Sequence, residues 1–425
     1  VRFVYDSELP EAFLKYFMDK LGMDEDDNLI PGKRYHNFKD FIKFPNVGGK
    51  ELQYQKIVQL PVKQLEDEKS VFTAIKKKDV LIHYPYQTFN YFIDLLREAA
   101  IDPKVKSIKI TIYRLASESK VVNALINAAK NGKKVTVVIE LQARFDEENN
   151  IYWSNQLQEE GVIVLHGLAG LKIHSKICII SRKENSKLVN YCSIGTGNYN
   201  ESTANLYSDF SLFTANTKIT IEVSKVFKII EGKITPYYFK HLVLSPNNLR
   251  NKLVRLINTE KRNALAGKPA FIYLKLNSLV DNDLITKLYQ ASKAGVKIKL
   301  NIRGISSIIA GVEGLSENIE AISILDKFLE HSRIYVFCNN DNPKYYISSA
   351  DWMVRNLDRR IEVTCPIYDK DIQQEIQDFL DIQFKDNVKA RSLDKRLTNK
   401  YRELPNDKPI RAQFELYEYY KSKLS

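Results

Sequence analysis

LKIHSKICII, residues 171–180, is typical of a buried strand except that its centre places one imidazole between two ammonium groups. Side chains alternate between the two faces of a strand, so we expect Lys172, His174 and Lys176 on one face. Burying unpaired ammonium groups costs too much free energy to serve packing alone. The stretch therefore predicts that an anion binds beside the histidine.

The same arrangement predicts a chemical role for His174. Two neighbouring cations lower the pKa of an imidazole, because they disfavour its charged form. We expect His174 to be neutral at pH 7 and able to act as a nucleophile. The alternative is a histidine that only packs in the core, which is the commoner role of a lone histidine in an apolar strand.

The composition is consistent with an anionic partner. The 425 residues carry a formal net charge of +12, which favours nucleic acid, a phosphate-rich substrate or a membrane surface as partner. A basic surface without a specific ligand is the alternative. No apolar run reaches the length of about 18 residues that a membrane-spanning helix needs.

Four cysteines lie in or beside apolar stretches: Cys178, Cys192, Cys338 and Cys365. Their spacing suits neither a zinc site nor a redox pair. We therefore expect reduced thiols in a cytoplasmic protein.

Strands alternate with amphipathic helices from Asp79 onward, which is typical of α/β proteins. Residues 107–115 read as a strand, and the helix that follows ends at Gly132, as helices often do. The same order returns at residues 271–304, where Gly295 takes the place of Gly132. The chain thus contains two related α/β halves.

These patterns divide the chain into three parts. We expect residues 1–70 to form the end of a helical or mixed head domain, residues 71–245 the first α/β domain and residues 246–425 the second. At the second boundary, Ser245-Pro246 predicts the start of a helix, with serine as its cap and proline in its first turn. Because the chain begins at Val1 without a methionine, we expect it to be part of a longer protein.

The halves differ around the histidine stretch. Our alignment of the two halves places His331 opposite Glu160. The triplet HSR that begins at His331 then lies on a different strand from His174, and the strand pair at 171–192 has no counterpart in the second half. We therefore expect chemically unequal halves, with His174 as the nucleophile.

A second motif follows the histidine stretch at Gly195-Thr196-Gly197-Asn198. Glycines let backbone N–H groups approach an anion closely, and the asparagine adds a side-chain donor or acceptor. A tight turn is the alternative interpretation. Residues 191–200 align with residues 344–353 of the second half.

Three arginines follow predicted strands: Arg114, Arg144 and Arg303. Ligands of open α/β sheets bind beyond the carboxyl ends of the strands, and a guanidinium fits phosphate oxygens in a bidentate way. Each arginine alone is as well explained by a surface carboxylate. Together they favour a basic, phosphate-binding cleft between the halves.

Several longer stretches resemble the polyphosphate kinase family, whose catalytic half consists of two phospholipase D-like α/β domains. The resemblance covers nearly the whole chain and is carried by LKIHSK, YRLASES, ELQARFDEENN, IGTGNYNESTANLYSDFSL, LEHSRIYVF and SSADWMVRNLDRRIEV. It implies an enzyme that reversibly transfers the γ-phosphoryl group of ATP to inorganic polyphosphate through a phosphohistidine, with Mg²⁺ as cofactor. We also expect a cytoplasmic homo-oligomer without a specific nucleic-acid partner, whose basic surface permits peripheral attachment to a membrane.

The resemblance implies the residues of the reaction centre. His174 matches the histidine that is phosphorylated during turnover, and Lys176 and Asn198 match the residues that hold the phosphoryl oxygens. Ser181 stands where the phospholipase D signature usually has an aspartate. We expect Asp209 to bind the far imidazole nitrogen of the nucleophile and to set its tautomer.

The resemblance also implies the substrate contacts. Arg114 and Arg144 match residues of the phosphate and magnesium site. The residues expected to contact ATP are Tyr207, Arg303, His331 and Lys172. His331 is further expected to act as a phosphate contact or a general acid.

Two other functions fit parts of the pattern. A phospholipase D-like phosphodiesterase or nuclease needs two HxK motifs that meet at a pseudo-twofold axis, and our alignment leaves only one. A module that binds polyanions without catalysis is permitted by the net charge.

Overall fold

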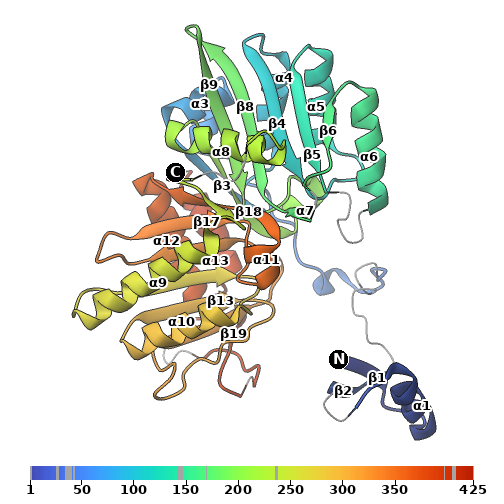
Figure 1. The fold of residues 1–425 in the computed structure, drawn as a ribbon, viewed down its shortest axis with the longest axis vertical. Coiled ribbons are helices and arrows are strands. Elements are labelled where there is room, and N and C mark those ends of the chain that lie inside the picture. The colour runs from blue at the N-terminus through green and yellow to red at the C-terminus, as the bar shows by residue number, and fades with distance from the viewer. Residues whose placement is uncertain are drawn as a thin grey trace. The chain divides into compact units, whose positions relative to one another are not determined.

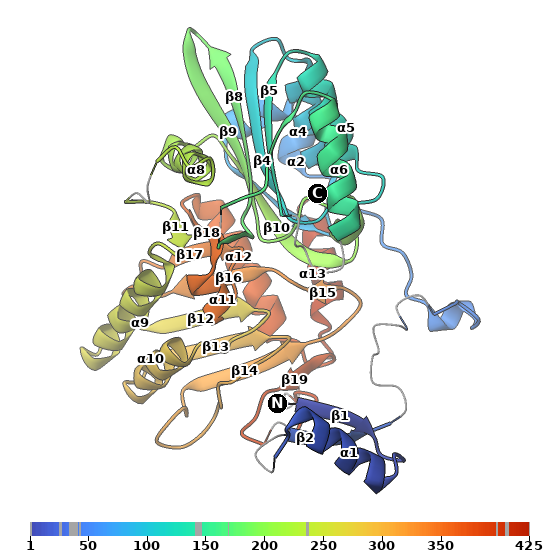
Figure 2. The same cartoon turned by 45° about the vertical axis from the view of Figure 1, so that its right-hand side comes forward.

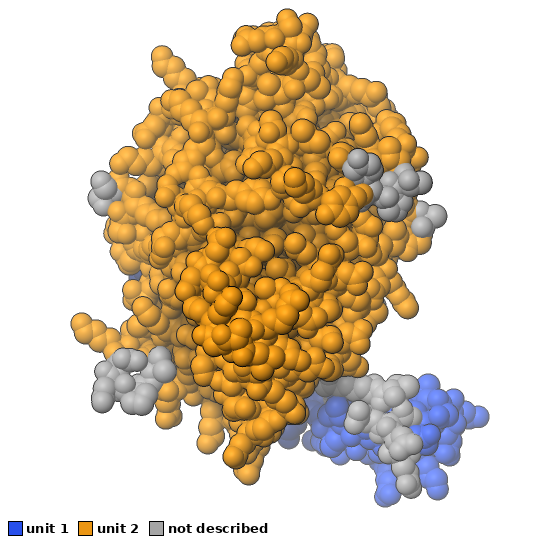
Figure 3. Space-filling model, turned by 60° about the vertical axis from the view of Figure 1, so that its left-hand side comes forward, with its two compact units in different colours: residues 1–56 blue, residues 57–425 orange. Residues whose placement is uncertain are grey.

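The computed structural model describes residues 2–24, 28–33, 41, 44–140, 147–168, 170–234, 238–396, 398–403 and 408–424. The chain forms two compact units, residues 1–56 and residues 57–425 (Figure 3). Our division at residues 70 and 245 remains a prediction.

The first unit is mixed rather than helical. It contains β1 (Arg2–Asp6), α1 (Glu11–Leu21) and β2 (Asn28–Gly32), and its two strands pair in parallel. The helix was predicted, but its apolar side chains are not buried. Of the two expectations for this region, helical or mixed, the described part of this unit agrees with the mixed one.

The second unit contains two sheets of similar build (Figure 1). The first sheet has the order β10-β9-β8-β4-β5-β6, and β3 pairs with β10 on its other side. Its strands are β3 (Val80–Tyr84), β4 (Val105–Ile112), β5 (Lys134–Ile139), β6 (Ile163–Leu165), β8 (Lys176–Glu184), β9 (Lys187–Gly195) and β10 (Tyr207–Thr214).

The second sheet repeats this order as β11-β18-β17-β16-β12-β13-β14, with β19 added at the edge. Its strands are β11 (Val243–Ser245), β12 (Phe271–Leu276), β13 (Lys297–Ile302), β14 (Ile319–Ile324), β16 (Arg333–Phe337), β17 (Lys344–Ser348), β18 (Arg360–Ile367) and β19 (Ala390–Ser392). The prediction of two related α/β halves is confirmed.

Each half also gives one short strand to the other half. β7 (Lys172–Ile173) pairs in parallel with β18 of the second sheet. β15 (Leu329–Glu330) pairs in parallel with β10 of the first sheet. The opening stretch is therefore not one strand: the chain leaves the second sheet after Ile173 and enters the first sheet at Lys176, with His174 and Ser175 at the crossing.

The repeated helices follow their predicted pattern. The helices that follow β4 and β12 are α5 (Lys120–Lys130) and α10 (Asn282–Lys293), and Ser119 and Asp281 cap them by accepting from backbone N–H groups. Gly132 and Gly295 follow these helices with φ of 74° and 95°, a region in which glycine is favoured.

The predicted helix start at Ser245-Pro246 is wrong. Ser245 is the last residue of β11, and α9 (Leu249–Leu265) begins after Asn248. The Ser245 hydroxyl donates to the Asn356 carbonyl at 2.5 Å instead of capping a helix. A serine before a proline is therefore used here to end a strand.

Three hydrophobic clusters hold the second unit together. One lies within the first half beneath α4 (Asn90–Ile101) and α5, and a second lies within the second half beneath α9 and α10. The third and central cluster joins both sheets to α8 (Thr217–Ile230), α12 (Lys370–Phe384) and α13 (Ala412–Ser422). Figure 2 shows α8 on the opposite face of the first sheet from α4 and α5.

All four cysteines are free and buried, as expected. Within the described ranges, no helix combines the length and the apolar character that crossing a bilayer requires.

The central cluster should dominate the stability of the second unit. Leu380 on α12 is fully buried there, whereas Leu265 at the end of α9 is 69% exposed. We expect Leu380→Ala to lower the free energy of unfolding by about 2–5 kcal/mol, through lost burial and a cavity. Leu265→Ala removes the same atoms and should change it by at most about 0.5 kcal/mol. Denaturant unfolding measures both, and equal losses would contradict the assigned core.

Candidate active site

His174 is held by the opposite half of the unit. Its backbone N–H donates to the Ile361 carbonyl at 3.0 Å, and Nδ1 lies 2.9 Å from the Glu362 carboxylate. Glu362 is fully buried and also accepts from the side chains of Ser349 and Asn356. A carboxylate that accepts a hydrogen bond from Nδ1–H keeps the proton of the neutral ring on Nδ1 and leaves a free lone pair on Nε2. His174 is thus oriented for nucleophilic attack through Nε2.

His331 is held in the same way by the first half. Its backbone N–H donates to the Ser208 carbonyl at 3.2 Å, and Nδ1 lies 2.7 Å from Asp209. The Thr196 hydroxyl donates to the same carboxylate at 2.6 Å. A Cβ on Gly197 would fall 2.0 Å from the Asp209 Oδ2. Glycine is therefore required there to make room for the carboxylate that positions His331.

These contacts correct the predicted partner of Asp209. We expected it to orient His174, but it binds His331, and Glu362 orients His174. Glu362 has the same place in β18 that Asp209 has in β10. Glu362 follows β17 and α11 (Val354–Asp358), and Asp209 follows the corresponding strand and helix of the first half. This shared order is the sequence signal that would have found Glu362.

The predicted alignment of His331 with Glu160 is wrong. Lys176 pairs with Gly195 in the first sheet, and Arg333 pairs with Ser348 at the matching point of the second. HSK at 174–176 and HSR at 331–333 therefore occupy equivalent positions. The strand pair β8–β9 likewise has a counterpart in β16–β17, so it does not belong to the first half alone.

Burial and positive charge keep both imidazoles neutral. Burial lowers the pKa of His174 well below its usual value, and Lys176, Arg360 and Arg333 lower it further. Burial and the Arg333 guanidinium lower the pKa of His331 to about 4. The predicted neutral state of His174 agrees with these directions, although burial contributes more than the cations.

Lys176 is the buried cation of the first half. Its side chain is 2% exposed, and its ammonium donates to the His174 carbonyl. Burial lowers the pKa of Lys176 to about 7, against the opposing charge of Glu362. A bound phosphate would supply the missing negative charge and raise that pKa.

Arg333 is the matching cation of the second half, and sequence analysis did not select it. It is 4% exposed, and it donates to the Thr196 carbonyl at 3.2 Å and to Asp351 at 3.0 Å. Its Nη1 lies 3.2 Å from the His331 Nε2. Because it also lowers the pKa of His174, its charge acts on both histidines. The signal that would have found it is the likeness of HSR to HSK.

Three predicted residues surround the imidazole rings. Tyr207 packs against His331 with ring centroids 5.2 Å apart. Arg303 donates through Nε to the backbone carbonyl of Glu330 at 2.7 Å, and Glu330 directly precedes His331. On the other side, Arg114 lies 5.8 Å from the ring of Tyr113, which packs edge-on against His174.

The remaining predicted residues have different positions. Lys172 begins β7 and pairs with Arg360. Asn198 lies in the loop after β9, and its Oδ1 is buried without a hydrogen-bond partner among the described residues. Arg144 lies outside the described residues.

A second layer of buried groups supports Ser208, the residue whose carbonyl holds His331. His83 is fully buried, with Nε2 2.9 Å from the Ser208 hydroxyl and Nδ1 3.0 Å from the Tyr420 hydroxyl. Burial and the Lys275 ammonium lower its pKa well below the usual value. His83 was not selected from the sequence, because it lies in an ordinary apolar strand.

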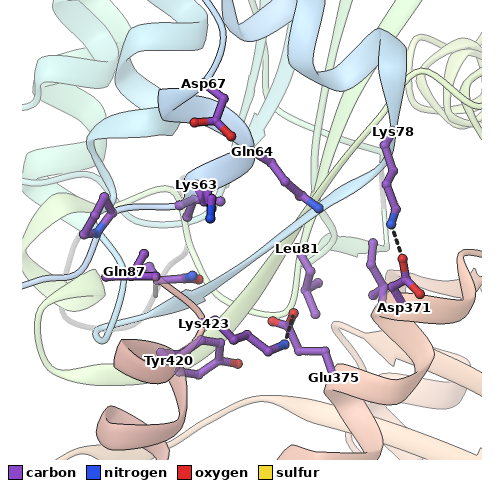
Figure 4. A pocket seen from close by; sticks show the side chains of 14 residues that line it. Lys63, Gln64, Asp67, Lys78, Leu81, Gln87, Asp371, Glu375, Tyr420 and Lys423 are labelled. Atoms are coloured by element: carbon purple, nitrogen blue, oxygen red, sulfur yellow. Dashed lines mark hydrogen bonds and ion pairs between the residues drawn. The ribbon is translucent and has the colours of Figure 1, made fainter.

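Tyr420 also lines a cavity of about 350 Å³ between β3 and helices α12 and α13 (Figure 4). Charges of opposite sign face each other there. Lys423 lies 2.9 Å from Glu375, and Lys78 pairs with Asp371. This mutual neutralisation distinguishes the cavity from a site for anions.

The described carboxylates are poorly suited to hold a magnesium ion. Glu362, Asp209 and Asp351 are each occupied by histidine, arginine or hydroxyl donors. In the described part of the chain, no group of three or more His, Cys, Asp or Glu could hold a metal. Arg114, assigned to a magnesium site by resemblance, carries no acceptor atom for a cation.

Comparison with known proteins identifies the family of this site. Residues 70–236 match polyphosphate kinase C-terminal domain 1, and residues 242–413 match polyphosphate kinase C-terminal domain 2. The polyphosphate kinase of Vibrio cholerae serotype O1 is 52% identical over 422 residues, which cover 99% of this chain and 60% of the relative. That of Escherichia coli K12 is 50% identical over 424 residues, with 99% and 62% covered. The chain thus spans about three fifths of these relatives.

Solved structures agree with this assignment. The crystal structure of polyphosphate kinase from Porphyromonas gingivalis superimposes with a TM-score of 0.88 at 39% identity, over 99% of this chain and 64% of the other. Phosphatidylserine synthase from Haemophilus influenzae Rd KW20 superimposes with a TM-score of 0.51 at 11% identity, over 82% and 94%, and shares the fold alone. The chain belongs to the polyphosphate kinase family.

Proposed function

We propose that this chain is the catalytic part of a polyphosphate kinase that reversibly transfers the γ-phosphoryl group of ATP to inorganic polyphosphate. The observation that supports this most strongly is the state of His174. Its Nδ1 is bound to a buried carboxylate, its pKa is well below the usual range, and three cations surround it. This combination supplies a nucleophile and a place for phosphoryl oxygens.

In the first step, the Nε2 lone pair of His174 forms a bond to the γ-phosphorus of ATP. The bond from that phosphorus to the bridging oxygen breaks, and ADP leaves with the electron pair. The ring becomes positively charged, because its proton stays on Nδ1 and remains hydrogen-bonded to the Glu362 carboxylate. The buried carboxylate balances that charge, so no proton has to be removed from Nε2.

In the second step, a terminal oxygen of the polyphosphate chain attacks the phosphohistidine. The new P–O bond forms as the N–P bond breaks, and His174 returns to its neutral state. Lys176 and Arg333 neutralise the phosphoryl oxygens in both steps. The covalent intermediate means that two polyanions never have to react directly. Because a phosphohistidine is a high-energy phosphoramidate, the transfer runs in both directions.

The remaining predicted residues have substrate roles in this proposal. Arg114 and Arg144 bind phosphates, and Asn198 contacts the phosphoryl group through its amide. The nucleotide contacts are Tyr207, Arg303, His331 and Lys172. His331 is neutral in the free protein, with Nδ1 toward Asp209, so its Nε2 donates to a phosphate oxygen only after a bound phosphate has raised its pKa and Nε2 has been protonated. It acts as a general acid only where a bound phosphate raises its pKa.

Magnesium enters this proposal with the substrate. Because the described carboxylates are occupied, we propose that Mg²⁺ binds to the phosphates of ATP, as it commonly does in phosphoryl transfer, and neutralises part of their charge. We also keep as proposals a homo-oligomer, a cytoplasmic location with peripheral membrane attachment through the basic surface, and no specific nucleic-acid partner.

A phosphodiesterase remains a second candidate because of the corrected alignment. The sequence argument against it was the lack of a second HxK motif, and HSR at 331–333 occupies the equivalent position. Release of product from a phosphodiester substrate, lost in His174→Ala, would favour it. The polyanion-binding alternative predicts binding without turnover and without dependence on His174.

Labelling of the histidine tests the proposed function. The full-length protein incubated with γ-labelled ATP should acquire one acid-labile, base-stable label at His174. His174→Gln should abolish the label and polymer synthesis, because the equivalent His331 has the Arg333 guanidinium 3.2 Å from its Nε2, where the phosphorus would have to approach. The exposed His166 provides the matched control, and His166→Gln should keep both. Label retained in His174→Gln contradicts the assignment.

The pKa of Lys176 predicts a pH dependence. Its ammonium must be charged to bind phosphate, and its pKa of about 7 in the free protein means that it is protonated below and neutral above that pH. We expect kcat/KM for ATP to fall about tenfold per pH unit above pH 7, because this parameter reports groups of the free enzyme.

Lys176→Arg is the diagnostic variant, since arginine keeps its charge throughout this range and stands naturally at the equivalent Arg333. Its kcat/KM should stay level where that of the parent protein falls. Lys106→Arg at an exposed position should leave the profile unchanged. A falling limb that persists in Lys176→Arg would show that another group titrates.

A further inference from the structure

A second cavity, of about 370 Å³, lies at the end of β17 and β18 away from the histidines. Its lining contains four lysines, one histidine and no carboxylate. The lysines are Lys240, Lys252, Lys344 and Lys370. We name these four residues and the space between them the lysine pocket.

No described carboxylate neutralises these lysines. None of the four ammonium groups forms an ion pair within the part of the chain that the structure describes, and Lys370 donates to the Gln373 amide oxygen at 3.0 Å. Lys252 is half-buried, and burial together with the Lys344 charge lowers its pKa. The buried Glu222 nearby accepts from the backbone N–H groups of residues 240–242 and supports that segment. The lysine pocket therefore gathers positive charge that no described ion pair neutralises, and its three exposed lysines, Lys240, Lys344 and Lys370, present this charge to an anion from solvent.

The cavity beside Tyr420 provides an internal comparison. It also contains three lysines, but three acidic residues line it with them, and two of the lysines are paired. Charge balance is thus achieved in one cavity of this unit and not in the other. A surface that is merely basic does not explain this difference.

The first half provides a second comparison, because its equivalent positions are known from the sheet registers. Ser348 pairs with Arg333, and Gly195 pairs with the equivalent Lys176, so Ser348 corresponds to Gly195. Four residues earlier in each strand, Lys344 therefore corresponds to Tyr191. By the same registers and the matching helix starts, the counterparts of Lys240, Lys252 and Lys370 are Asp79, Tyr91 and Thr217. The fold therefore does not require lysine at any of the four positions.

The lysine pocket is separate from the reaction centre but lies on the same strand. Tyr368 at the pocket follows Glu362 by six residues along β18 and its end. Six residues of extended chain span roughly 20 Å. A ligand in the lysine pocket therefore does not contact the His174 imidazole, whereas a long polymer can reach both places.

We propose that the lysine pocket is an accessory site for inorganic polyphosphate, which holds the polymer away from its reacting end. The identity of the polymer rests on the proposed function. Lysine ammonium groups act as point charges that bind phosphate groups in any orientation, which suits a flexible polymer. Single-stranded nucleic acid needs aromatic rings on which bases stack. Here Tyr345 and Tyr346 are buried, which leaves Tyr368, 43% exposed, as a single exposed tyrosine ring of the lining, with His241 edge-on and Lys218 beside it.

The test uses the full-length protein and the variant Lys240→Gln/Lys344→Gln/Lys370→Gln. We expect the Kd for fluorescent long-chain polyphosphate to rise at least about tenfold, with a weaker dependence of binding on salt concentration. The KM for long-chain polyphosphate should rise in parallel. Tripolyphosphate, which has only three phosphate groups and does not span the roughly 20 Å between the two places, should bind the reaction centre as before. Labelling of His174 by ATP should not change.

The matched control is Lys106→Gln/Lys268→Gln/Lys293→Gln, which removes the same charge from three exposed lysines outside the pocket. It should leave the Kd within about twofold of the parent protein. Equal weakening in both triple variants would overturn the site in favour of general charge attraction. Weakening confined to single-stranded nucleic acid would also overturn it.

Failure of the proposed function is distinguishable from failure of the site. If ATP does not label His174, the function is wrong, while the binding measurement still decides on the lysine pocket. If labelling occurs and polyphosphate binding is the same in the parent protein and the pocket variant, only the accessory site is wrong.

Discussion

The pair of a histidine with a buried carboxylate from the other half is the interaction on which the rest of this unit depends. His174 follows β7 and is held by Glu362, and His331 follows β15 and is held by Asp209. Each short strand is hydrogen-bonded to the sheet of the opposite half. Neither half can therefore orient its own histidine. Separation of the halves would remove the orienting carboxylate from both histidines. The central hydrophobic cluster, which joins both sheets, stabilises this exchange.

The two histidine positions are equivalent in place but not in chemistry. The first combines a glutamate partner with Lys176, whose charge responds to pH and to a bound phosphate. The second combines an aspartate with Arg333, which keeps its charge at any physiological pH and lies against the ring. A nucleophile needs an open face and adjustable charge, whereas a phosphate contact needs permanent charge. The difference between Lys176 and Arg333 thus agrees with the proposed division of roles.

Much of the fold and part of the site could be predicted from the sequence. The two α/β halves, the glycines that end their helices and His174 with Lys176 follow from local periodicity and spacing. The exchange could not be predicted, because β7 and β15 have two residues each and show no periodicity. Glu362 lies 188 residues from His174, beyond any local pattern. The alignment failed at His331 because it matched β16 to β6, whose counterpart in the second sheet is β14.

The most direct test of the exchange is the NMR spectrum of the imidazole nitrogens, which needs no substrate. Both histidines should show the neutral form with the proton on Nδ1. Glu362→Gln should shift the nitrogen signals of His174 and leave those of His331 in place, while Asp209→Asn should do the reverse. If Asp209→Asn shifts the signals of His174 and Glu362→Gln does not, each half orients its own histidine and the account is wrong.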